Sequence, residues 1–331
     1  MTDSIFKSRT SVEPPNEINS ERALRPTRLA DYVGQAQMRS AIEVMIGATK
    51  KREEALDHVL LYGPPGLGKT TMANIIANEL GVNIRHTSGP AVERAGDLVA
   101  ILTALQPRDV LFIDEIHRLR NDLEEILYSA LEDYAIDIVT GSGATPRTLR
   151  LSLAPFTCIG ATTRAGSITG PLRDRFGAAF RLEFYQQAEL EAIITRSAGL
   201  LKIGISPAAT ILLAACSRGT PRFANRLLRR ARDEAQVQGL EVISVELAQT
   251  TLTRLQIDGG GLDPTDQAYL DVLAKTFKGG PAGVAALAAS LAEDVLTVED
   301  VIEPYLLRLG LIARTLRGRI LTPEGKKYLK K

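Results

Sequence analysis

The first half of the chain alternates short apolar runs with segments whose apolar residues recur every three or four positions. Continuous apolar runs, which predict buried β-strands, lie at 58–63, 82–89, 109–115, 156–163 and 178–185. Helical spacing, which predicts helices, occurs at 38–46, 70–81, 98–106 and 122–134. Strands that alternate with helices indicate an α/β domain whose parallel sheet is covered on both faces. Residues 136–153 depart from this alternation, and their Gly-rich centre predicts a β-hairpin.

The second half of the chain changes to helical spacing alone. Four helical segments predict a small bundle, and the glycines at 259–261 mark a linker. Beyond the linker, three helical segments precede two short apolar stretches divided by RTLRGR, which is the order of a winged helix. We therefore expect a mobile polar arm at 1–20, a large domain at 21–185, a small helical domain at 186–257 and a winged-helix domain at 262–331.

Global charge does not indicate a nucleic-acid partner, because 40 basic residues balance 39 acidic ones among 331 residues. Local charge does, since the segment from Val301 to Lys331 has two acidic residues, Glu303 and Glu324, and eight basic ones. The basic residues are Arg308, Arg314, Arg317, Arg319, Lys326, Lys327, Lys330 and Lys331. This segregation predicts a face that contacts a phosphate backbone, although a solvated basic face has the same composition. No aromatic residues interleave as a stacking platform, so contact with duplex DNA is favoured over single strands.

Other features of the composition exclude several classes of protein. Cys158 and Cys216 lie in apolar contexts, which predicts two buried free thiols. Three histidines without a Cys/His cluster argue against a structural zinc site. No apolar run approaches the roughly 18 residues of a membrane-spanning helix, and the first residues lack a signal-peptide core. We expect a soluble, cytoplasmic protein without membrane contact.

The segment GPPGLGKT, from Gly63 to Thr70, matches the phosphate-binding pattern G-x-x-x-x-G-K-[ST] between a predicted strand and a predicted helix. Glycine lets backbone N–H groups close around phosphate oxygens, and the following helix adds the partial positive charge of its N-terminus. Lys69 is placed to reach the outer phosphates, and the Thr70 hydroxyl is placed to ligate Mg²⁺. The sequence therefore predicts a site for a nucleotide with its metal ion.

Two acidic residues, Asp114 and Glu115, end an apolar strand, at the sheet edge where ligands bind in open parallel sheets. Asp114 suits Mg²⁺, directly or through water, and Glu115 suits a general base that polarises an attacking water. Thr163, at the end of the next strand, offers a hydroxyl that can orient the same water. The alternative is a pair of acids that cap the following helix.

Arginines that can stabilise a transferred phosphoryl group occur in PLRDRFG, which contains Arg173 and Arg175, and in GTPRFANR, which contains Arg222. Spacing alone does not separate this role from an ordinary surface salt bridge, for example with Asp174.

Taken in order, these motifs resemble an AAA+ ATPase, and longer segments resemble the RuvB family of bacterial AAA+ ATPases. The segments are ALRPTRLADYVGQ, LYGPPGLGKTT, LEDYAIDI, IGATTRAG, GTPRFANRLLRR and IARTLRGR. The resemblance extends from about residue 20 to residue 331 and includes the tail, which generic AAA+ proteins lack. It implies a P-loop parallel sheet, a helical lid at 186–257 and a C-terminal winged helix.

The resemblance also implies a set of functional residues. The Walker A, Walker B, sensor 1, arginine-finger and sensor 2 positions correspond to Lys69, Asp114, Glu115, Thr163, Arg175 and Arg222. Contacts with ATP are implied for Leu24, Arg25, Gly63, Gly66, Gly68, Lys69, Thr70, Thr71, Glu132, Asp133, Tyr134, Arg175, Tyr185 and Arg222. Ligation of Mg²⁺ is implied for Thr70 and Asp114. The arginine finger of this family acts on the ATP of the neighbouring subunit, which implies a hexameric ring.

The partners implied by the resemblance are Holliday-junction and duplex DNA, RuvA and, in the wider complex, the resolvase RuvC. The hairpin near 136–153 is the expected docking element for RuvA, and Arg314 and Arg319 are the expected DNA contacts. The family often has a basic residue near 293–296, where this chain reads EDVL, so that DNA contact is left open. The implied function is ATP-driven branch migration in homologous recombination and DNA repair, within the SOS response.

Three other functions share parts of this sequence. A clamp-loader-type ATPase has the P-loop, sensors and lid, but carries a helical collar in place of the basic wing. A non-catalytic, ATP-gated DNA scaffold has no need of Glu115 or Arg175. A protein-unfolding ring requires an aromatic pore loop and an adaptor domain, and neither is apparent.

Overall fold

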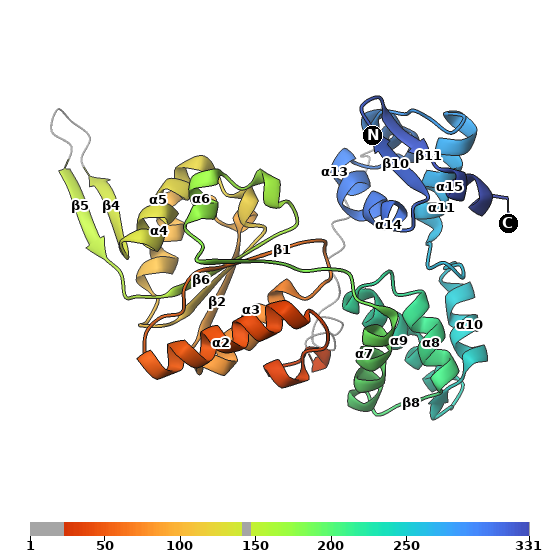
Figure 1. Cartoon of the computed structure of the whole chain (residues 1–331), viewed down its shortest axis with the longest axis horizontal. Helices are drawn as coiled ribbons and strands as arrows, with labels where there is room; N and C mark the ends of the chain where they lie inside the picture. Colours follow the sequence, from red (N-terminus) through yellow and green to blue (C-terminus); the bar gives the residue numbers. More distant parts are fainter. Residues whose placement is uncertain (1–22, 141–146, 331) are drawn as a thin grey trace, which may run out of the picture.

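The structure, a computed structural model, describes residues 23–140 and 147–330, so the predicted arm at 1–20 lies outside the described residues. Figure 1 shows three units along the chain, namely a sheet domain with a protruding hairpin, a helical bundle and a third domain next to the bundle. The bundle and the third domain lie on the same side of the sheet domain, opposite the hairpin (Figure 1).

A five-stranded parallel sheet forms the centre of the first domain, with the strand order β2–β3–β6–β1–β7. The strands are β1 (Val59–Tyr62), β2 (Ile84–Ser88), β3 (Val110–Asp114), β6 (Thr157–Thr162) and β7 (Ala178–Arg181). Val59 and Leu61 pack in the core on one face of the sheet, whereas Leu60 packs in the core on the other. Both faces are buried, which explains the continuous apolar runs and confirms the predicted α/β class.

Helices cover both faces of this sheet. On one face, α2 (Ala36–Arg52) and α3 (Lys69–Leu80) bury apolar residues such as Ile42 and Ile76. On the other face, α4 (Ala95–Thr103) and α5 (Asn121–Glu132) bury residues such as Leu98 and Leu127. Short segments complete the domain: η1 (Leu29–Asp31), η2 (Gly89–Ala91), η3 (Ile116–Arg118), η4 (Ala165–Ser167) and α6 (Gly170–Asp174).

The predicted hairpin is confirmed as β4 (Ala135–Thr140) and β5 (Arg147–Ser152), which pair antiparallel from Ala135 opposite Ser152 to Thr140 opposite Arg147. The two strands form a sheet of their own, and the hairpin projects from the sheet domain away from the other units (Figure 1). Ala135 and Ile136 at its base are buried, whereas Leu149 is exposed. The fold therefore anchors the hairpin at its base and presents its outer part to the surroundings.

The helical bundle contains α7 (Gln187–Leu200), α8 (Pro207–Ala215), α9 (Pro221–Val237) and α10 (Val245–Arg254). Ser206, Thr220 and Ser244 cap the last three helices by accepting a backbone N–H three residues later. The core of the bundle is continuous with the α2–α3 face of the sheet domain. Strands β8 (Gly204–Ile205) and β9 (Val242–Ile243) pair in parallel here, and two residues are too few for a recognisable strand pattern.

The third domain has the predicted winged-helix order of three helical segments and a hairpin. The helical segments are α11 (Pro264–Asp271) with η5 (Val272–Thr276), α12 (Val284–Leu291), and α13 (Val295–Thr297) with η6 (Val298–Ile302) and α14 (Glu303–Arg308). The hairpin, called the wing below, is β10 (Ile312–Thr315) and β11 (Gly318–Leu321). A final helix, α15 (Pro323–Tyr328), was not predicted, although Thr322 and Pro323 are typical residues for a helix start.

The Gly-rich linker is held in place by both flanking domains. The Asp258 carboxylate accepts hydrogen bonds from the N–H groups of Gly260 and Leu262, both at 2.9 Å. Tyr305 donates to the Gly260 carbonyl at 2.6 Å, and Arg218 of the bundle donates to the Gly261 carbonyl at 3.0 Å. Arg218 is also paired with Asp266 of the third domain. The linker therefore joins the two domains firmly.

Two predictions from composition can be checked on the described residues. Cys158 and Cys216 are buried and unpaired, as expected, and burial raises the pKa of the Cys216 thiol to about 11. Within residues 23–140 and 147–330, no helix has the length and apolar character needed to cross a bilayer.

Candidate functional site

A pocket of about 500 Å³ lies at the carboxyl end of the sheet, between the sheet domain and the helical bundle. It brings together segments that are far apart in the chain. Of the residues predicted to contact the nucleotide or to act in catalysis, it is lined by Leu24, Arg25, Gly66, Gly68, Lys69, Thr70, Thr71, Asp114, Glu115, Thr163, Tyr185 and Arg222.

The loop between β1 and α3 requires glycine at two positions. At Gly63, φ is +138° and a Cβ would lie 2.5 Å from the carbonyl oxygen of Leu182. At Gly68, φ is +102° and a Cβ would lie 2.9 Å from the Tyr32 hydroxyl oxygen. These conformations lead the chain into α3, whose first helical residue is Lys69, so the helix N-terminus faces the pocket. Gly63 therefore shapes the loop without lining the pocket.

One wall of the pocket combines a buried cation with two carboxylates. The Lys69 ammonium donates to the carbonyl oxygens of Gly63 at 2.7 Å and Pro64 at 3.0 Å. Burial lowers the pKa of Lys69, and the nearby Glu115 and Asp114 oppose that shift. Burial raises the pKa of Asp114, and the hydrogen bond from the Glu115 backbone N–H opposes that rise in part. Phosphates and a divalent cation together would satisfy these opposite charges.

The Glu115 carboxylate is held by two hydrogen bonds. Its Oε2 accepts from the Thr163 backbone N–H at 3.4 Å and from the Thr163 hydroxyl at 3.2 Å. The backbone of Glu115 has φ +46°, in the left-handed region that costs free energy for a residue with a side chain. This backbone conformation accompanies the contact of Glu115 with Thr163, the residue expected to orient the attacking water.

His117 is a further member of this cluster that the sequence did not identify. Its Nδ1 lies 3.2 Å from Glu115 Oε2 and 2.9 Å from Thr162 Oγ1. Burial lowers the pKa of His117, whereas Glu115 opposes that shift. In the sequence, only its position two residues after Glu115 in DEIH pointed to His117. That position does not show in which direction the imidazole ring points.

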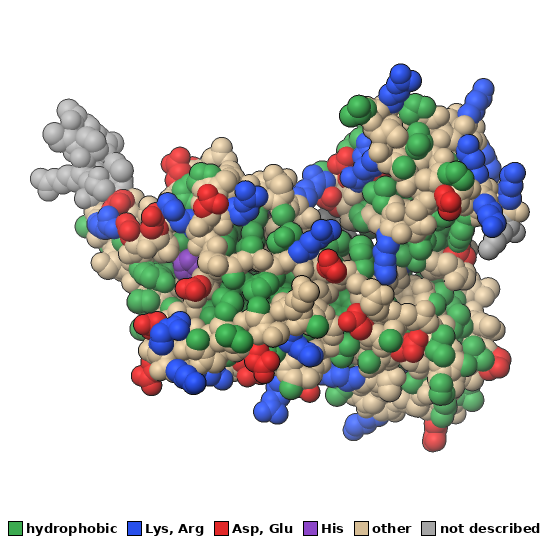
Figure 2. Space-filling view, in the orientation of Figure 1, with side chains coloured by type: hydrophobic (Ala, Val, Ile, Leu, Met, Phe, Trp, Pro, Cys, Tyr) green, Lys and Arg blue, Asp and Glu red, His purple; other side chains and the backbone are tan. Residues whose placement is uncertain are grey.

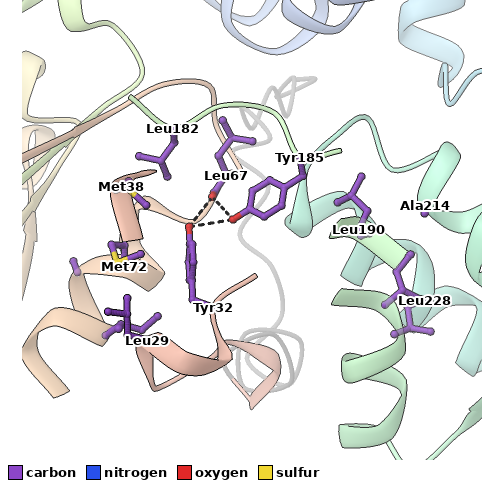
Figure 3. Packing of buried hydrophobic residues seen from close by; sticks show 14 of the residues in the cluster. Leu29, Tyr32, Met38, Leu67, Met72, Leu182, Tyr185, Leu190, Ala214 and Leu228 are labelled. Carbon is purple, nitrogen blue, oxygen red and sulfur yellow. Dashed lines mark hydrogen bonds between the residues drawn. The ribbon is translucent and has the colours of Figure 1, made fainter. Parts of the chain in front are cut away.

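Tyr185 connects the pocket with the junction between the sheet domain and the bundle. Figure 3 shows Tyr185 and Tyr32 pointing toward Leu67 of the phosphate loop. The Tyr185 hydroxyl oxygen lies 3.1 Å from Tyr32 Oη and 3.3 Å from the Leu67 carbonyl oxygen, and burial raises the pKa of Tyr185 to about 12. From the bundle, the Arg222 N–H donates to the Gly66 carbonyl at 3.4 Å. The position of the bundle is thus linked directly to the phosphate loop.

Besides Gly63, four predicted residues do not line this pocket, namely Glu132, Asp133, Tyr134 and Arg175. Arg175 is paired with Glu132 at 2.5 Å, and Asp133 is paired with Arg150 at 2.7 Å. The Tyr134 ring packs against Phe156, with ring centroids 5.8 Å apart. Arg175 and the Glu132–Tyr134 segment therefore lie outside the pocket, and Arg175 contacts that segment through Glu132.

The two predicted DNA contacts are held by carboxylates of their own domain. Glu303, which is fully buried, accepts from Arg314 Nε at 2.7 Å and from Arg319 Nε at 2.8 Å. Glu299 accepts from Arg319 Nη2 at 2.9 Å. Tyr269 also donates to Glu303, at 3.0 Å. The arginines are thus fixed in direction and partly neutralised.

Other residues of the predicted basic face are distributed differently. Arg308 does not belong to it, because its guanidinium donates to the Arg218 carbonyl at 3.0 Å and stacks on Phe184 at 4.5 Å. Arg317, at the turn of the wing beside the fully exposed Leu316, has no hydrogen bond or ion pair within the described residues. Figure 2 shows Lys and Arg side chains projecting from the outer edge of this domain.

Comparison with known proteins covers all three units. Residues 24–182 match the model of the P-loop domain of the Holliday junction DNA helicase RuvB, residues 185–258 the RuvB AAA lid domain, and residues 259–330 the RuvB C-terminal winged helix domain. The chain belongs to the RuvB family. Its membership confirms the predicted AAA+ architecture with lid and winged helix, and with it nucleotide binding and ATP hydrolysis.

Solved structures of RuvB agree with this chain in the arrangement of most of its length. Thermotoga maritima RuvB, described as a Holliday junction branch migration motor, is 47% identical, with a TM-score of 0.86 over 93% of this chain and 98% of that one. Two single-substitution variants of the same RuvB are each 48% identical over the same shares, with TM-scores of 0.86 and 0.87. The clamp-loader, scaffold and protein-unfolding alternatives are therefore not favoured.

Proposed function

We propose that the chain is an ATP-driven motor that moves duplex DNA and drives branch migration at Holliday junctions. The observation that carries this proposal is one pocket in which the phosphate loop, the acidic pair, Thr163 and the lid residue Arg222 meet. A winged helix with cationic side chains at its outer edge provides the matching surface for a phosphate backbone. Recombination and DNA repair are the processes that use this reaction, and the cytoplasm and the SOS response are the setting we propose.

In this proposal, Glu115 is the general base that polarises the attacking water, and Thr163 orients its carboxylate. Lys69 neutralises the outer phosphates, and Arg222 contacts them from the lid. Leu24, Arg25 and Tyr185 border the nucleotide. The contacts of Glu115 with Thr163 at 3.2 Å and with His117 at 3.2 Å support this assignment, because a base must be held in one direction.

Mg²⁺ is the metal we propose for the pocket, with Thr70 and Asp114 as its protein ligands. Among the described residues, no group of three or more His, Cys, Asp or Glu side chains is arranged to hold a metal alone. One carboxylate and one hydroxyl nevertheless fit Mg²⁺, which usually keeps few protein ligands and completes its shell with phosphates and water. Bound there, the ion would neutralise charge on the phosphates during transfer.

Arg175 is proposed to act on the nucleotide of a neighbouring subunit in a hexameric ring. Its pairing with Glu132, outside its own chain's pocket, supports this role, as does the grouping of Glu132–Tyr134 with it. A site shared between subunits makes hydrolysis depend on assembly. The projecting β4–β5 hairpin is proposed as the docking element for RuvA, with RuvC joining the wider complex.

The decisive experiment follows migration of a synthetic four-way DNA junction, with and without RuvA. We expect migration with ATP and Mg²⁺, none with a non-hydrolysable ATP analogue, and none with Glu115→Gln. ATP turnover is measured in the same samples. Turnover without any movement of the junction, with RuvA present, would leave an ATPase but refute the motor.

A further inference from the structure

The residue after Thr163, Arg164, makes a direct contact with the winged-helix domain. Its Nε donates to both carboxylate oxygens of Asp300 at 3.0 Å, and its Nη2 donates to Asp300 Oδ1 at 2.8 Å. The same Nη2 lies 3.6 Å from Glu299 Oε2. A residue adjoining the ATPase pocket thus contacts a residue of the winged-helix domain that lies 136 positions later in the chain.

The acidic residues that receive Arg164 also hold the wing. The Glu299 side chain accepts from Arg319 Nη2 at 2.9 Å, and its backbone carbonyl accepts from Arg314 Nη2 at 3.3 Å. Glu299 is therefore shared between Arg164 on one side and the wing arginines on the other. Only two side chains separate Thr163, in contact with Glu115, from the predicted DNA contacts.

The two domains do not pack tightly at this point. A cavity of about 520 Å³ lies between them, lined by Pro64, Pro65 and Thr163 from the sheet domain and by Pro304 and Arg314 from the winged-helix domain. The side chains of Arg164, Asp300 and Glu299 are 31%, 36% and 29% exposed. Ion pairs with this much access to water are weak, so the contact can open and re-form without disturbing either core.

The helix that carries the acidic residues is itself unusual. Val298–Ile302 is wound as a π-helix between α13 and α14, a form that is rare and is found mainly at functional sites. Figure 1 places α13 and α14 on the side of the winged-helix domain that faces the sheet domain. The wider winding lies where the two domains approach one another.

We propose that Arg164 is a positioning residue whose contact with Asp300 and Glu299 transmits the state of the ATPase pocket to the wing. The proposal rests on the proposed motor function and adds the route by which the two sites communicate within one subunit. When Thr163 moves with the nucleotide, Arg164 moves with it. If Arg164 withdraws, the Glu299 carboxylate is left to Arg319, which neutralises that arginine further and weakens its attraction to phosphate. Engagement of Arg164 therefore accompanies the tighter grip on DNA.

The test compares Asp300→Asn with Asp271→Asn. Both substitutions remove one carboxylate from the winged-helix domain and one partly exposed ion pair, with Arg164 or with Lys275 respectively. Duplex DNA affinity is measured by fluorescence anisotropy with a non-hydrolysable ATP analogue and with ADP, and ATP turnover is measured without DNA. We expect the ratio of the two affinities to shrink about two- to five-fold in Asp300→Asn, to stay at the wild-type value in Asp271→Asn, and turnover to be unchanged in both.

A distance measurement separates this proposal from the motor function. The native cysteines are buried, so spin labels can be attached through Val44→Cys and Leu316→Cys, at positions that are 70% and 108% exposed. Asp300→Asn should broaden the distance distribution, and the reversed pair Arg164→Asp with Asp300→Arg should narrow it again relative to either single variant. An unchanged distribution and affinity ratio in Asp300→Asn, or no recovery in the reversed pair, overturns the proposal even if turnover and junction migration are normal. If the wild-type chain does not drive junction migration, the motor function is refuted. The spin-label distances still test whether Arg164 and Asp300 hold the two domains together.

Discussion

The ATPase pocket and the wing satisfy their charges in opposite ways. In the pocket, Lys69, Asp114 and Glu115 are close together and partly buried, with charges that a nucleotide and its metal complete. In the wing, Arg314 and Arg319 already have partners in Glu303 and Glu299. The first region is prepared for a ligand that enters it. The second is already balanced and must share its cations with DNA.

The number of basic residues in a segment is therefore not a measure of the positive charge available to bind DNA. Arg314 and Arg319 each keep donors beyond those used by the carboxylates, so each can still contact phosphate, but with reduced net charge. Arg317 has no such partner within the described residues and carries its whole charge at the turn of the wing. The comparison predicts large effects on turnover from the pocket and graded effects on affinity from the wing.

The largest effect is expected for Arg175→Ala, which should lower ATP turnover by about 10³- to 10⁵-fold if the residue completes a neighbour's site. Mixing this variant with Lys69→Ala should restore part of the activity, because mixed interfaces combine an intact pocket with an intact arginine. Turnover is measured across mixing ratios, with each variant alone as the control. An absence of rescue at every ratio argues against action between subunits.

Glu115→Gln should lower turnover by about 10²- to 10⁴-fold while ATP still binds, since the amide cannot accept the proton of the attacking water. Binding is measured with a fluorescent ATP analogue, and Lys69→Ala is the contrasting variant that should lose turnover through lost phosphate contact. Near-normal turnover in Glu115→Gln would remove Glu115 as the base.

Two single variants, Arg317→Ala and Arg314→Ala, test the wing by comparison with each other. Arg317→Ala should lower the slope of log affinity against log salt by about one unit, regardless of DNA sequence, and leave stability unchanged. Arg314→Ala should weaken DNA binding and also cost roughly 1–3 kcal/mol of stability, because the buried Glu303 loses a partner. Salt titrations and thermal melts measure the two effects, with Lys275→Ala in η5 as a control for loss of a surface cation. Equal stability of the two variants would contradict the view that Arg314, unlike Arg317, stabilises the domain by pairing with Glu303.

A smaller effect concerns the core that supports the pocket. His58 uses both ring nitrogens in its neutral form, with Nδ1 accepting from the Cys158 N–H at 3.0 Å and Nε2 lying 3.0 Å from the Leu131 carbonyl, and burial lowers its pKa. Below pH of about 6.5 the unfolded chain gains a proton that the folded chain resists, so stability is lost as the pH falls. We expect His58→Gln to melt at a lower temperature than the wild-type chain at pH 7.5. Its melting temperature should then fall less between pH 7.5 and pH 5.5, by about 2–4 °C, than that of the wild-type chain. If the melting temperatures of both proteins fell equally with pH, His58 would not be the source of the pH dependence.

Most of the fold was predictable because its signals are local. Continuous apolar runs predicted the strands, and the Gly-rich match at 63–70 predicted the phosphate loop. The contacts of His117 and Arg164 were not predictable, because a turn in the chain does not show which distant residues a side chain meets. The charge of the wing was overestimated because Glu299 and Asp300 lie just before Val301, where the basic segment begins, and because Arg308 turns inward.

The fixed linker has a mechanical consequence. Because Arg218 contacts Gly261 and Asp266 while Arg308 reaches back to the bundle, the last two domains form one stiff arm. That arm meets the sheet domain near Tyr185, beside the phosphate loop, and ends at Leu316. A small rotation at its base sweeps the wing through a larger arc, so displacement of the DNA grows with the length of the arm.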